Sequence, residues 1–159
     1  MRRKDREITD PNAIFTVIEQ CHVCRLGFCD DGDVYIVPLH FGYARNGARA
    51  TLYFHGAQEG RKMALIAKNP RVGFEMDTGA EVYTKGAADV ACGYTARFQS
   101  VIGTGSASLV HDANEKRRAL ELLMSHSVEK RDWTFDERML AAVAVFKVEV
   151  EKMSCKSHE

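Results

Sequence analysis

The chain has 159 residues, of which 45% are hydrophobic and 28% charged, proportions typical of one ordinary globular domain. Its 22 basic and 22 acidic side chains give a formal net charge of zero, which argues against a general nucleic-acid-binding role. No apolar stretch reaches the roughly 20 residues of a membrane span, and no apolar segment follows the charged start to form a signal peptide. The sequence therefore predicts one domain over residues 1–159 that is cytoplasmic, with no membrane and no nucleic-acid partner.

The first predicted element is a helix over residues 11–21. Asp10 followed by Pro11 is typical of a helix start, because aspartate caps the first turn and proline fits its first position. Apolar side chains then recur at helical spacing as far as Cys21. These residues would turn one apolar face toward the core.

Three β-rich runs follow, at residues 22–29, 34–41 and 50–55. The acidic and glycine residues 30–33 predict a hairpin turn between the first two runs. Asn46-Gly47 is a strong turn pair, so we expect the second and third runs to be antiparallel neighbours as well.

A second helix is predicted over residues 61–68, ended by Asn69 and Pro70. Residues 72–76 alternate apolar and polar side chains, which predicts a strand with one buried face. Residues 79–96 show no clean period, and we interpret them as strand plus irregular loop.

Residues 98–110 predict two strands or one bent strand, because two glycines interrupt a β-rich run. A third helix starts after Asp112, a helical turn covers residues 135–140, and a final strand covers residues 142–150. This order of elements favours a mainly β protein with flanking helices (α+β), folded as a small antiparallel barrel rather than a doubly wound parallel sheet.

The five cysteines are an odd number in a chain with no secretion signal, so we expect reduced thiols rather than a disulfide framework. Cys21 and Cys24 form a C-x-x-C motif, which admits a zinc or redox interpretation. No second ligand pair follows in the sequence, and we therefore expect buried, unreactive cysteines and no metal site.

The segment 53–62 carries the clearest chemistry. A strand ends there, Gly56 and Gly60 allow tight turning, and a helix begins beside Arg61 and Lys62. Free N–H groups at a helix start together with two cations are suited to a phosphate, although two such cations can also form a solvated helix face. The glycines are four residues apart, so the segment is not a Walker A loop.

Five runs of the sequence resemble, in order, the motifs of the pyridoxamine 5'-phosphate oxidase-related flavoproteins, and most closely those of the nitroimidazole-resistance branch. The runs are VYIVPLHF at 34–41, YFHGA at 53–57, GRK at 60–62, NPRV at 69–72 and SVIGTG at 100–105. The resemblance covers nearly the whole chain. It implies an antiparallel FMN-binding split β-barrel that works as a homodimer with the flavin at the interface.

The resemblance also implies a cofactor-binding set drawn from three parts of the chain. In it, residues 37–39 lie along the isoalloxazine ring, Arg61 and Lys62 hold the phosphate, and Gln99 and Ser100 reach the flavin from the second subunit. The complete set is Val37, Pro38, Leu39, Phe54, His55, Gly56, Gly60, Arg61, Lys62, Gln99 and Ser100.

His55 is the candidate catalytic residue. The resemblance places it beside the flavin as a proton donor, and imidazole is the side chain best matched to proton transfer near neutral pH. The alternative is that His55 only hydrogen-bonds the phosphate or ribityl oxygens. His40 is two residues beyond Pro38 and could point to solvent, so it receives no role.

Two functions remain open from the sequence. The first is an FMN-dependent oxidoreductase that takes electrons from a small-molecule donor, such as a reduced nicotinamide, and passes them to a small organic acceptor such as a nitroaromatic. The second is a flavin- or haem-binding protein without turnover, acting as a sensor, carrier or sequestering factor. The sequence does not choose between FMN, a deazaflavin and haem.

Overall fold

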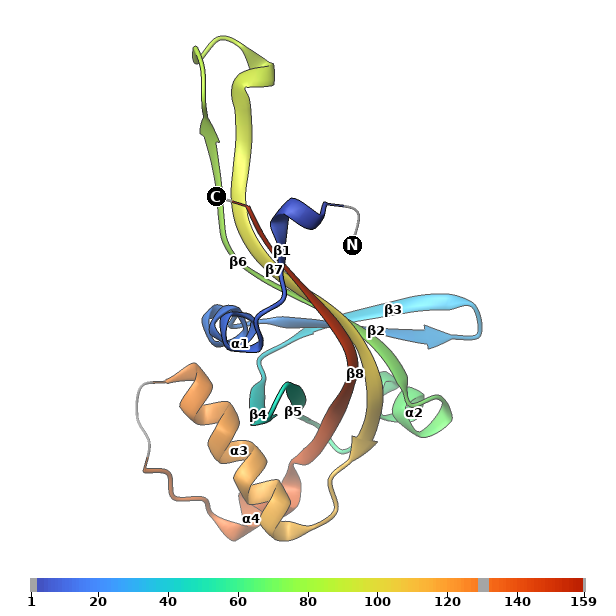
Figure 1. Cartoon of the computed structure of the whole chain (residues 1–159). Helices are drawn as coiled ribbons and strands as arrows, with labels where there is room; N and C mark the ends of the chain where they lie inside the picture. Colours follow the sequence, from blue (N-terminus) through green and yellow to red (C-terminus); the bar gives the residue numbers. More distant parts are fainter. Residues whose placement is uncertain (1–2, 129–131, 159) are drawn as a thin grey trace.

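The computed structural model describes residues 3–128 and 132–158 (Figure 1), in which one antiparallel sheet of eight strands is flanked by helices. The helices are α1 (Pro11–Gln20), α2 (Arg61–Lys68), α3 (Ala113–Ser127) and α4 (Glu137–Ala142), with 3-10 turns at Lys4–Arg6 and Ala91–Gly93. The strands are β1 (Glu7–Ile8), β2 (Cys24–Asp30), β3 (Asp33–Leu39), β4 (Gly42–Asn46), β5 (Arg49–Gly56), β6 (Arg71–Thr84), β7 (Tyr94–Leu109) and β8 (Ala144–His158). The predicted mainly β, α+β class is confirmed.

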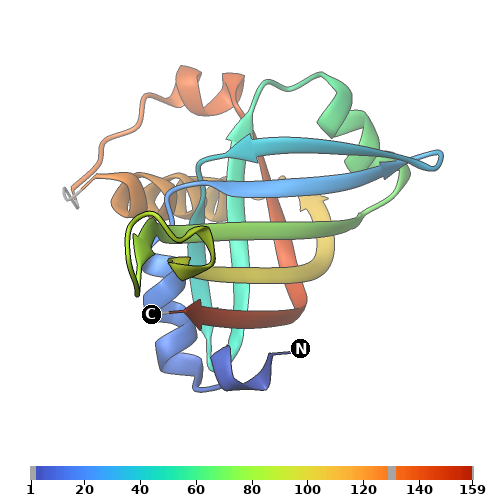
Figure 2. The same cartoon turned by 90° about the horizontal axis from the view of Figure 1, so that it is seen from above.

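The sheet curls on itself. Its strands are ordered β3-β2-β6-β7-β8-β5-β4, with β1 added beside β8, and every neighbouring pair is antiparallel. Figure 2 shows β5 running across the direction of β2 and β6 rather than alongside them. β3 and β4 stand at the two ends of the order, so the barrel is open between them.

The core fills the enclosed side of this curled sheet. Phe28, Phe41, Phe54 and Phe146 are at most 1% exposed, and the last two stack with ring centroids 5.1 Å apart. Burial of each phenylalanine side chain removes apolar surface from water, and this hydrophobic stabilisation holds the curled sheet closed. Phe28, Phe54 and Phe146 come from β2, β5 and β8, and Phe41 comes from the link between β3 and β4, so the core joins distant parts of the sheet.

Helix α1 closes the core along one side. The Asp10 carboxylate accepts a hydrogen bond of 2.9 Å from the N–H of Ala13, which is the cap that the sequence predicts. Ile14, Val17 and Ile18 are buried against the sheet. The predicted helix over residues 11–21 is confirmed, with Cys21 as its C-cap rather than its last residue.

The predicted pairing of run 34–41 with run 50–55 is wrong. β3 ends at Leu39, and a separate strand, β4, forms the hairpin with β5 around Asn46-Gly47. The chain leaves the plane of β3 because Phe41 is fully buried, and Gly42 lies so close to α3 that a Cβ there would overlap the α3 backbone. The turn pair was recognised correctly, but the strand that enters it was missed.

Residues 98–110 form part of one bent strand, as one of the two predicted readings has it. The register between β7 and β8 shifts between Thr104 and Gly105. A Cβ on Gly103 would overlap the Phe74 ring and the carbonyl oxygen of Lys152, and one on Gly105 would overlap the carbonyl oxygen of Glu149. The two glycines are therefore required where β7 packs most closely on its neighbours.

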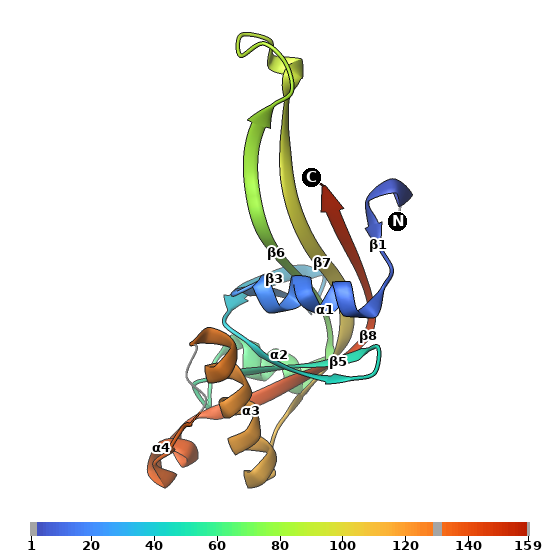
Figure 3. The ribbon, with the colours of Figure 1, turned by 60° about the vertical axis from the view of Figure 1, so that its left-hand side comes forward.

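The outer half of the β6–β7 hairpin projects from the body as an arm, seen clearly in Figures 1 and 3. Beyond a register shift between Thr78 and Glu81, the two strands pair with each other as far as Thr84 and Tyr94. The interpretation of 79–96 as strand plus loop is confirmed. The final strand is longer than predicted, because its second half extends along β7 and β1 as far as His158.

Three of the cysteines are fully buried: Cys21, Cys24 and Cys155. Burial raises the pKa of the Cys21 thiol to about 12 and raises that of Cys24 further, so neither is a thiolate near neutral pH. Among the described residues no helix is long and apolar enough to cross a membrane, and no three metal-ligating side chains cluster together.

Candidate functional site

The segment from β5 to α2 forms the candidate site. β5 alternates, so that Phe54 faces the core while His55 lies on the opposite side of the strand. The strand ends at Gly56, which pairs with Ala144 at the start of β8. The loop 57–60 then leads directly into α2.

His55, Lys62 and His40 form a cluster at this end of β5. The pKa of His55 is lowered by burial of the ring first, and then by the nearby Lys62 and His40. A Cβ built on Gly56 would lie 2.8 Å from both Cε and Nζ of Lys62, so the lysine side chain lies across the strand end. Because residue 56 is glycine, the Lys62 ammonium can lie at the strand end, and a larger residue at this position would displace it.

The N-terminus of α2 opens beside this cluster. Gly60 is its N-cap, with φ of +126°, and no side chain caps the helix there. The carbonyl oxygen of Gly60 accepts hydrogen bonds from the N–H groups of Met63 and Ala64, and no side chain caps the N–H groups of Arg61 and Lys62 that precede them. Donors and a cation at one place are the elements of a phosphate site.

Arg61 and Lys62 are adjacent in sequence but have different partners. The Arg61 guanidinium lies 3.0 Å from the Asp30 carboxylate and 4.6 Å from the centre of the Tyr35 ring. Lys68, at the other end of α2, pairs with Asp31 in the turn between β2 and β3. Arg61 therefore ties α2 to the β2–β3 hairpin, while Lys62 faces the strand end.

The predicted ring-binding run on β3 divides between the two faces of its strand. Val37 and Leu39 are half-buried and pack against the core, whereas Pro38 is exposed on the opposite face, opposite Arg25 of β2. Phe54 is fully buried, so only its backbone is available to a ligand. One face of this run can line a flat ring, but the three side chains cannot do so together.

Gln99 and Ser100 lie in another part of the molecule. Gln99 donates a long hydrogen bond of 3.5 Å from Nε2 to Oγ of Ser157, near the end of β8, whereas Gly56 pairs with Ala144 at its start. Thirteen positions separate Ala144 from Ser157, which is roughly 40 Å of strand. Within one chain the two predicted halves of the flavin site do not meet.

Sequence reasoning assigned no role to His40, which the structure places in the cluster. Its Nδ1 lies 3.0 Å from the carbonyl oxygen of His22, and its charge contributes to the lowered pKa of His55. The two-residue link between β3 and β4 is what brings it there. The missed strand β4 and the missed histidine thus have the same cause.

Comparison with known proteins agrees with this architecture. A profile of the pyridoxamine 5'-phosphate oxidase family matches residues 10–157, and no curated protein sequence matches the chain. A Bacteroides thetaiotaomicron protein assigned to 5-nitroimidazole antibiotic resistance is 29% identical, with a TM-score of 0.80, covering 96% of this chain and 90% of its own.

Two further solved structures share the fold at lower identity. The FAD- and haem-binding protein of Mycobacterium smegmatis is 18% identical with a TM-score of 0.81, over 97% of this chain and 74% of its own. A flavocytochrome of Azotobacter vinelandii is 20% identical with a TM-score of 0.78, over 100% of this chain and 72% of its own. The profile match over almost the whole chain, with a fold shared at these scores, shows that the protein belongs to the pyridoxamine 5'-phosphate oxidase-like family of split β-barrels.

Proposed function

We propose that the protein binds FMN as a homodimer and is an oxidoreductase that reduces a small organic acceptor, such as a nitroaromatic compound. The observation that carries the proposal is the meeting of the Lys62 ammonium, the uncapped start of α2 and His55 at one end of β5. A phosphate ester fits this place, because it would receive both hydrogen-bond donors and a compensating charge.

The residues present fit the phosphate end of a flavin mononucleotide. Gly60 is open around its Cα, with no atom within 4 Å of a Cβ built there, so a ligand can approach the backbone closely. Lys62 would hold the phosphate, and Arg61 would hold α2 in position through Asp30. When bound, the flavin would supply the redox chemistry, accepting two electrons from a donor and passing them to the acceptor.

His55 has a proton-handling role in this proposal. Its lowered pKa leaves the imidazole neutral near neutral pH while the Lys62 ammonium lies close to it. A phosphate dianion next to Lys62 would offset that positive charge and raise the pKa of His55 toward its ordinary value. His55 would then be able to hold a proton beside the phosphate end of the cofactor.

The separation of the two predicted ligand regions along β8 supports a homodimer. Gln99 and Ser100 lie at the opposite end of that strand from Gly56, so the chain that binds the phosphate does not supply them. In an isologous pair, each subunit offers its Gln99 end to the other subunit's phosphate end. Two equivalent sites per dimer would result.

The structural relatives support a flavin and leave its kind open. One is a nitroimidazole-resistance protein, another binds FAD and haem, and a third is a FAD-binding protein of Mesorhizobium loti. Binding of flavin or haem without turnover is therefore the second function to test, and it would fit the same fold.

The test is to purify the protein, identify its chromophore from the visible spectrum, and titrate flavin-free protein with FMN, FAD and haemin. Steady-state oxidation of NADH or NADPH is then followed with a nitroimidazole acceptor. We expect stoichiometric FMN binding and turnover. A bound chromophore without turnover would replace the oxidoreductase with a binding protein, and failure to bind any flavin would overturn both.

A further inference from the structure

A groove lies between α3, α4 and the start of β8, at the end of the molecule opposite the β6–β7 arm (Figures 1 and 3). It consists of two adjoining depressions, of about 280 and about 250 Å³, that share His111 and Lys116. Each is close to the roughly 300 Å³ at which sites for small organic molecules begin. The groove is therefore large enough for a small organic ligand.

The floor of the groove is apolar. Val110 and Val145 line it and are at most 7% exposed, and the N–H of Val110 donates to the carbonyl oxygen of Val145 at 2.9 Å. Leu109 is 37% exposed and Val143 is half-buried in the first depression, and Leu140 of α4 lines the second. A ligand with a hydrocarbon part would remove this apolar surface from water.

Lys116 is the cation of the groove. It is half-buried on α3 and lines both depressions. Within residues 3–128 and 132–158, the first depression has no carboxylate in its lining, and its ionisable side chains are Lys116 and His111. A half-buried ammonium has already lost part of its hydration, so an anion placed beside it would be stabilised more than one at a fully exposed lysine.

The carboxylates nearest to Lys116 in the chain have other partners. The Asp112 carboxylate accepts the N–H of Glu115 at 2.8 Å and caps α3, and the Glu115 carboxylate pairs with Lys147 at 2.8 Å. Glu137, in the second depression, pairs with Arg117. Among the described residues no carboxylate lies within ion-pair distance of Lys116, so its charge is uncompensated in the groove.

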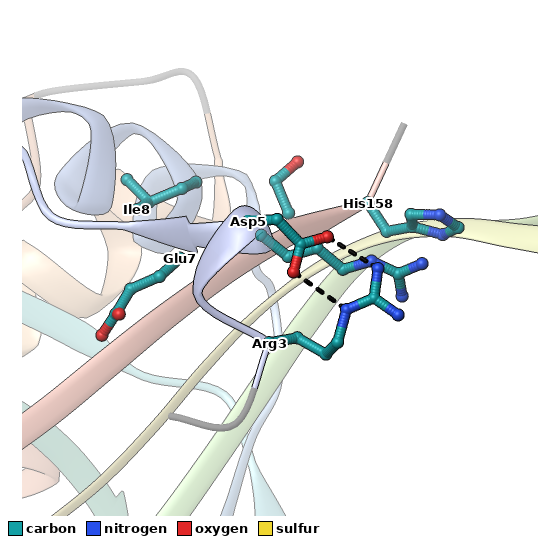
Figure 4. Close-up of a pocket in the computed structure, with 7 residues that line it drawn as sticks. Arg3, Asp5, Glu7, Ile8 and His158 are labelled. Carbon is teal, nitrogen blue, oxygen red and sulfur yellow. Dashed lines mark hydrogen bonds and ion pairs between the residues drawn. The ribbon is translucent and has the colours of Figure 1, made fainter.

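A larger depression at the far end of β8 does not have this property. It has a volume of about 410 Å³ and lies between the N-terminal segment and the last residues of β8 (Figure 4). Its Arg3 pairs with Asp5 at 2.6 Å, and Glu7 is a second carboxylate in its lining. Its cations are therefore balanced by acidic side chains, whereas Lys116 is not.

The groove is also separate from the candidate phosphate site. Gln58, in the loop that leads into α2, donates from Nε2 to the carbonyl oxygen of Ala141 at 2.7 Å and forms the border between that loop and the groove. The start of α3 differs from the start of α2, because Asp112 caps it with a negative charge. A phosphate dianion would be repelled there, and one lysine matches a single negative charge better.

We propose that this groove binds a small monocarboxylic acid with an apolar body. The carboxylate lies at Lys116, with the His111 imidazole as a second hydrogen-bond donor, and the body covers Leu109 and Val143. An inorganic anion would leave the apolar floor exposed to water, and an alcohol would leave the ammonium uncompensated. The site goes beyond the proposed function and does not depend on a bound flavin.

The experiment titrates the protein as purified with octanoate and follows binding by calorimetry. Octanoate combines one carboxylate with a saturated chain, and it has no redox group that could react with a flavin. Lys116→Gln removes the cation, and we expect octanoate to bind about tenfold more weakly, through loss of one charge-assisted hydrogen bond. Lys116→Arg keeps the charge and should bind octanoate more tightly than Lys116→Gln does.

Arg118→Gln is the matched control, because it removes an exposed cation of the same helix that lines neither depression. It should leave octanoate affinity unchanged. Octanol keeps the chain without the charge, and acetate keeps the charge without the chain, so both should bind more weakly than octanoate. FMN affinity should be the same in Lys116→Gln as in the wild type.

Wild-type protein that does not bind octanoate, or equal binding by Lys116→Gln, would overturn the groove. So would equal weakening by Arg118→Gln, or binding of octanol or acetate as tight as that of octanoate. Weaker FMN binding by Lys116→Gln would place this lysine in the flavin site and overturn a separate groove. Protein that binds octanoate at Lys116 but no flavin would keep the groove and remove the proposed function.

Discussion

The two ends of β8 carry different kinds of chemistry. At Ala144 the strand adjoins Gly56, and the charge there is one lysine lying beside a histidine and an uncapped helix start. At Ser157 it adjoins Gln99, and there arginines and carboxylates alternate, with Arg3 paired to Asp5 and Arg97 to Glu81. The first end suits a phosphate ester, whereas the cations of the second end already have carboxylates beside them.

This difference is the reason that the proposed function uses two copies of the chain. The two ends are thirteen positions apart along β8, so Gly56 and Gln99 adjoin different parts of that strand. In the proposed homodimer, a second copy brings its Ser157 end to the Ala144 end of the first.

The largest expected effect is the recovery of binding by mixing two defective chains. Lys62→Ala damages the Ala144 end, and Ser100→Trp fills the space at the Ser157 end. Each variant alone should bind FMN poorly. After subunit exchange, each mixed dimer should hold one intact and one doubly damaged site, so about a quarter of all sites should recover wild-type affinity.

Fluorescence titration of FMN, with light scattering to confirm subunit exchange, measures this recovery. Mixing two preparations of the same variant is the control and should restore nothing. Full FMN binding by a monomer, or no recovery in dimers that have exchanged, would show that each chain completes its own site.

The next effect concerns the middle of β8, which sets the distance between its ends. Gly103→Ala places a methyl group against the Phe74 ring and the carbonyl oxygen of Lys152, and we expect a loss of about 3 kcal/mol in the free energy of unfolding. Gly73→Ala is the matched control, because its new Cβ would meet its nearest neighbour at 3.9 Å. Urea denaturation measures both, and equal losses would mean that β7 packs less closely on β6 and β8 than described.

Lys62→Ala tests the Ala144 end alone. If the ammonium holds the phosphate with a charge-assisted hydrogen bond, FMN should bind about tenfold to a hundredfold more weakly, while riboflavin affinity should barely change. Lys68→Ala removes a lysine from the same helix that is paired with Asp31, and it should leave FMN affinity unaltered. Equal weakening of FMN and riboflavin would place Lys62 on a solvated helix face.

Local rules predicted much of this molecule. The Asp10-Pro11 cap, the turn at Asn46-Gly47 and the bend at the β7 glycines each depend on near neighbours in sequence, and each is present. The cap, the turn and the bend can therefore be predicted from a few consecutive residues. The order of the predicted elements favoured a mainly β, α+β fold, and the resemblance specified a split β-barrel.

The failures depend on contacts between distant segments. β4 was missed because the chain turns where Phe41 enters the core and Gly42 meets α3, and neither contact is visible in residues 34–41. The different partners of Arg61 and Lys62 depend on the β2–β3 turn, which is about 30 residues earlier in the chain. The length of β8 depends on pairing with β1 at the opposite end of the sequence.

The smallest effect separates Arg61 from Lys62. The Arg61–Asp30 pair is half exposed, with 54% of the Arg61 side chain accessible, so solvent screens it and its loss should cost less than about 1 kcal/mol. Because the guanidinium is occupied by Asp30 and Tyr35, Arg61→Ala should weaken FMN no more than about threefold, within the range of an indirect change in the position of α2. Asp30→Asn removes the same ion pair but keeps the arginine, so it should change FMN affinity as little as Arg61→Ala does. If Arg61→Ala instead weakens FMN as strongly as Lys62→Ala while Asp30→Asn strengthens it, the guanidinium leaves the hairpin to hold the phosphate, and both cations of the sequence motif serve the ligand.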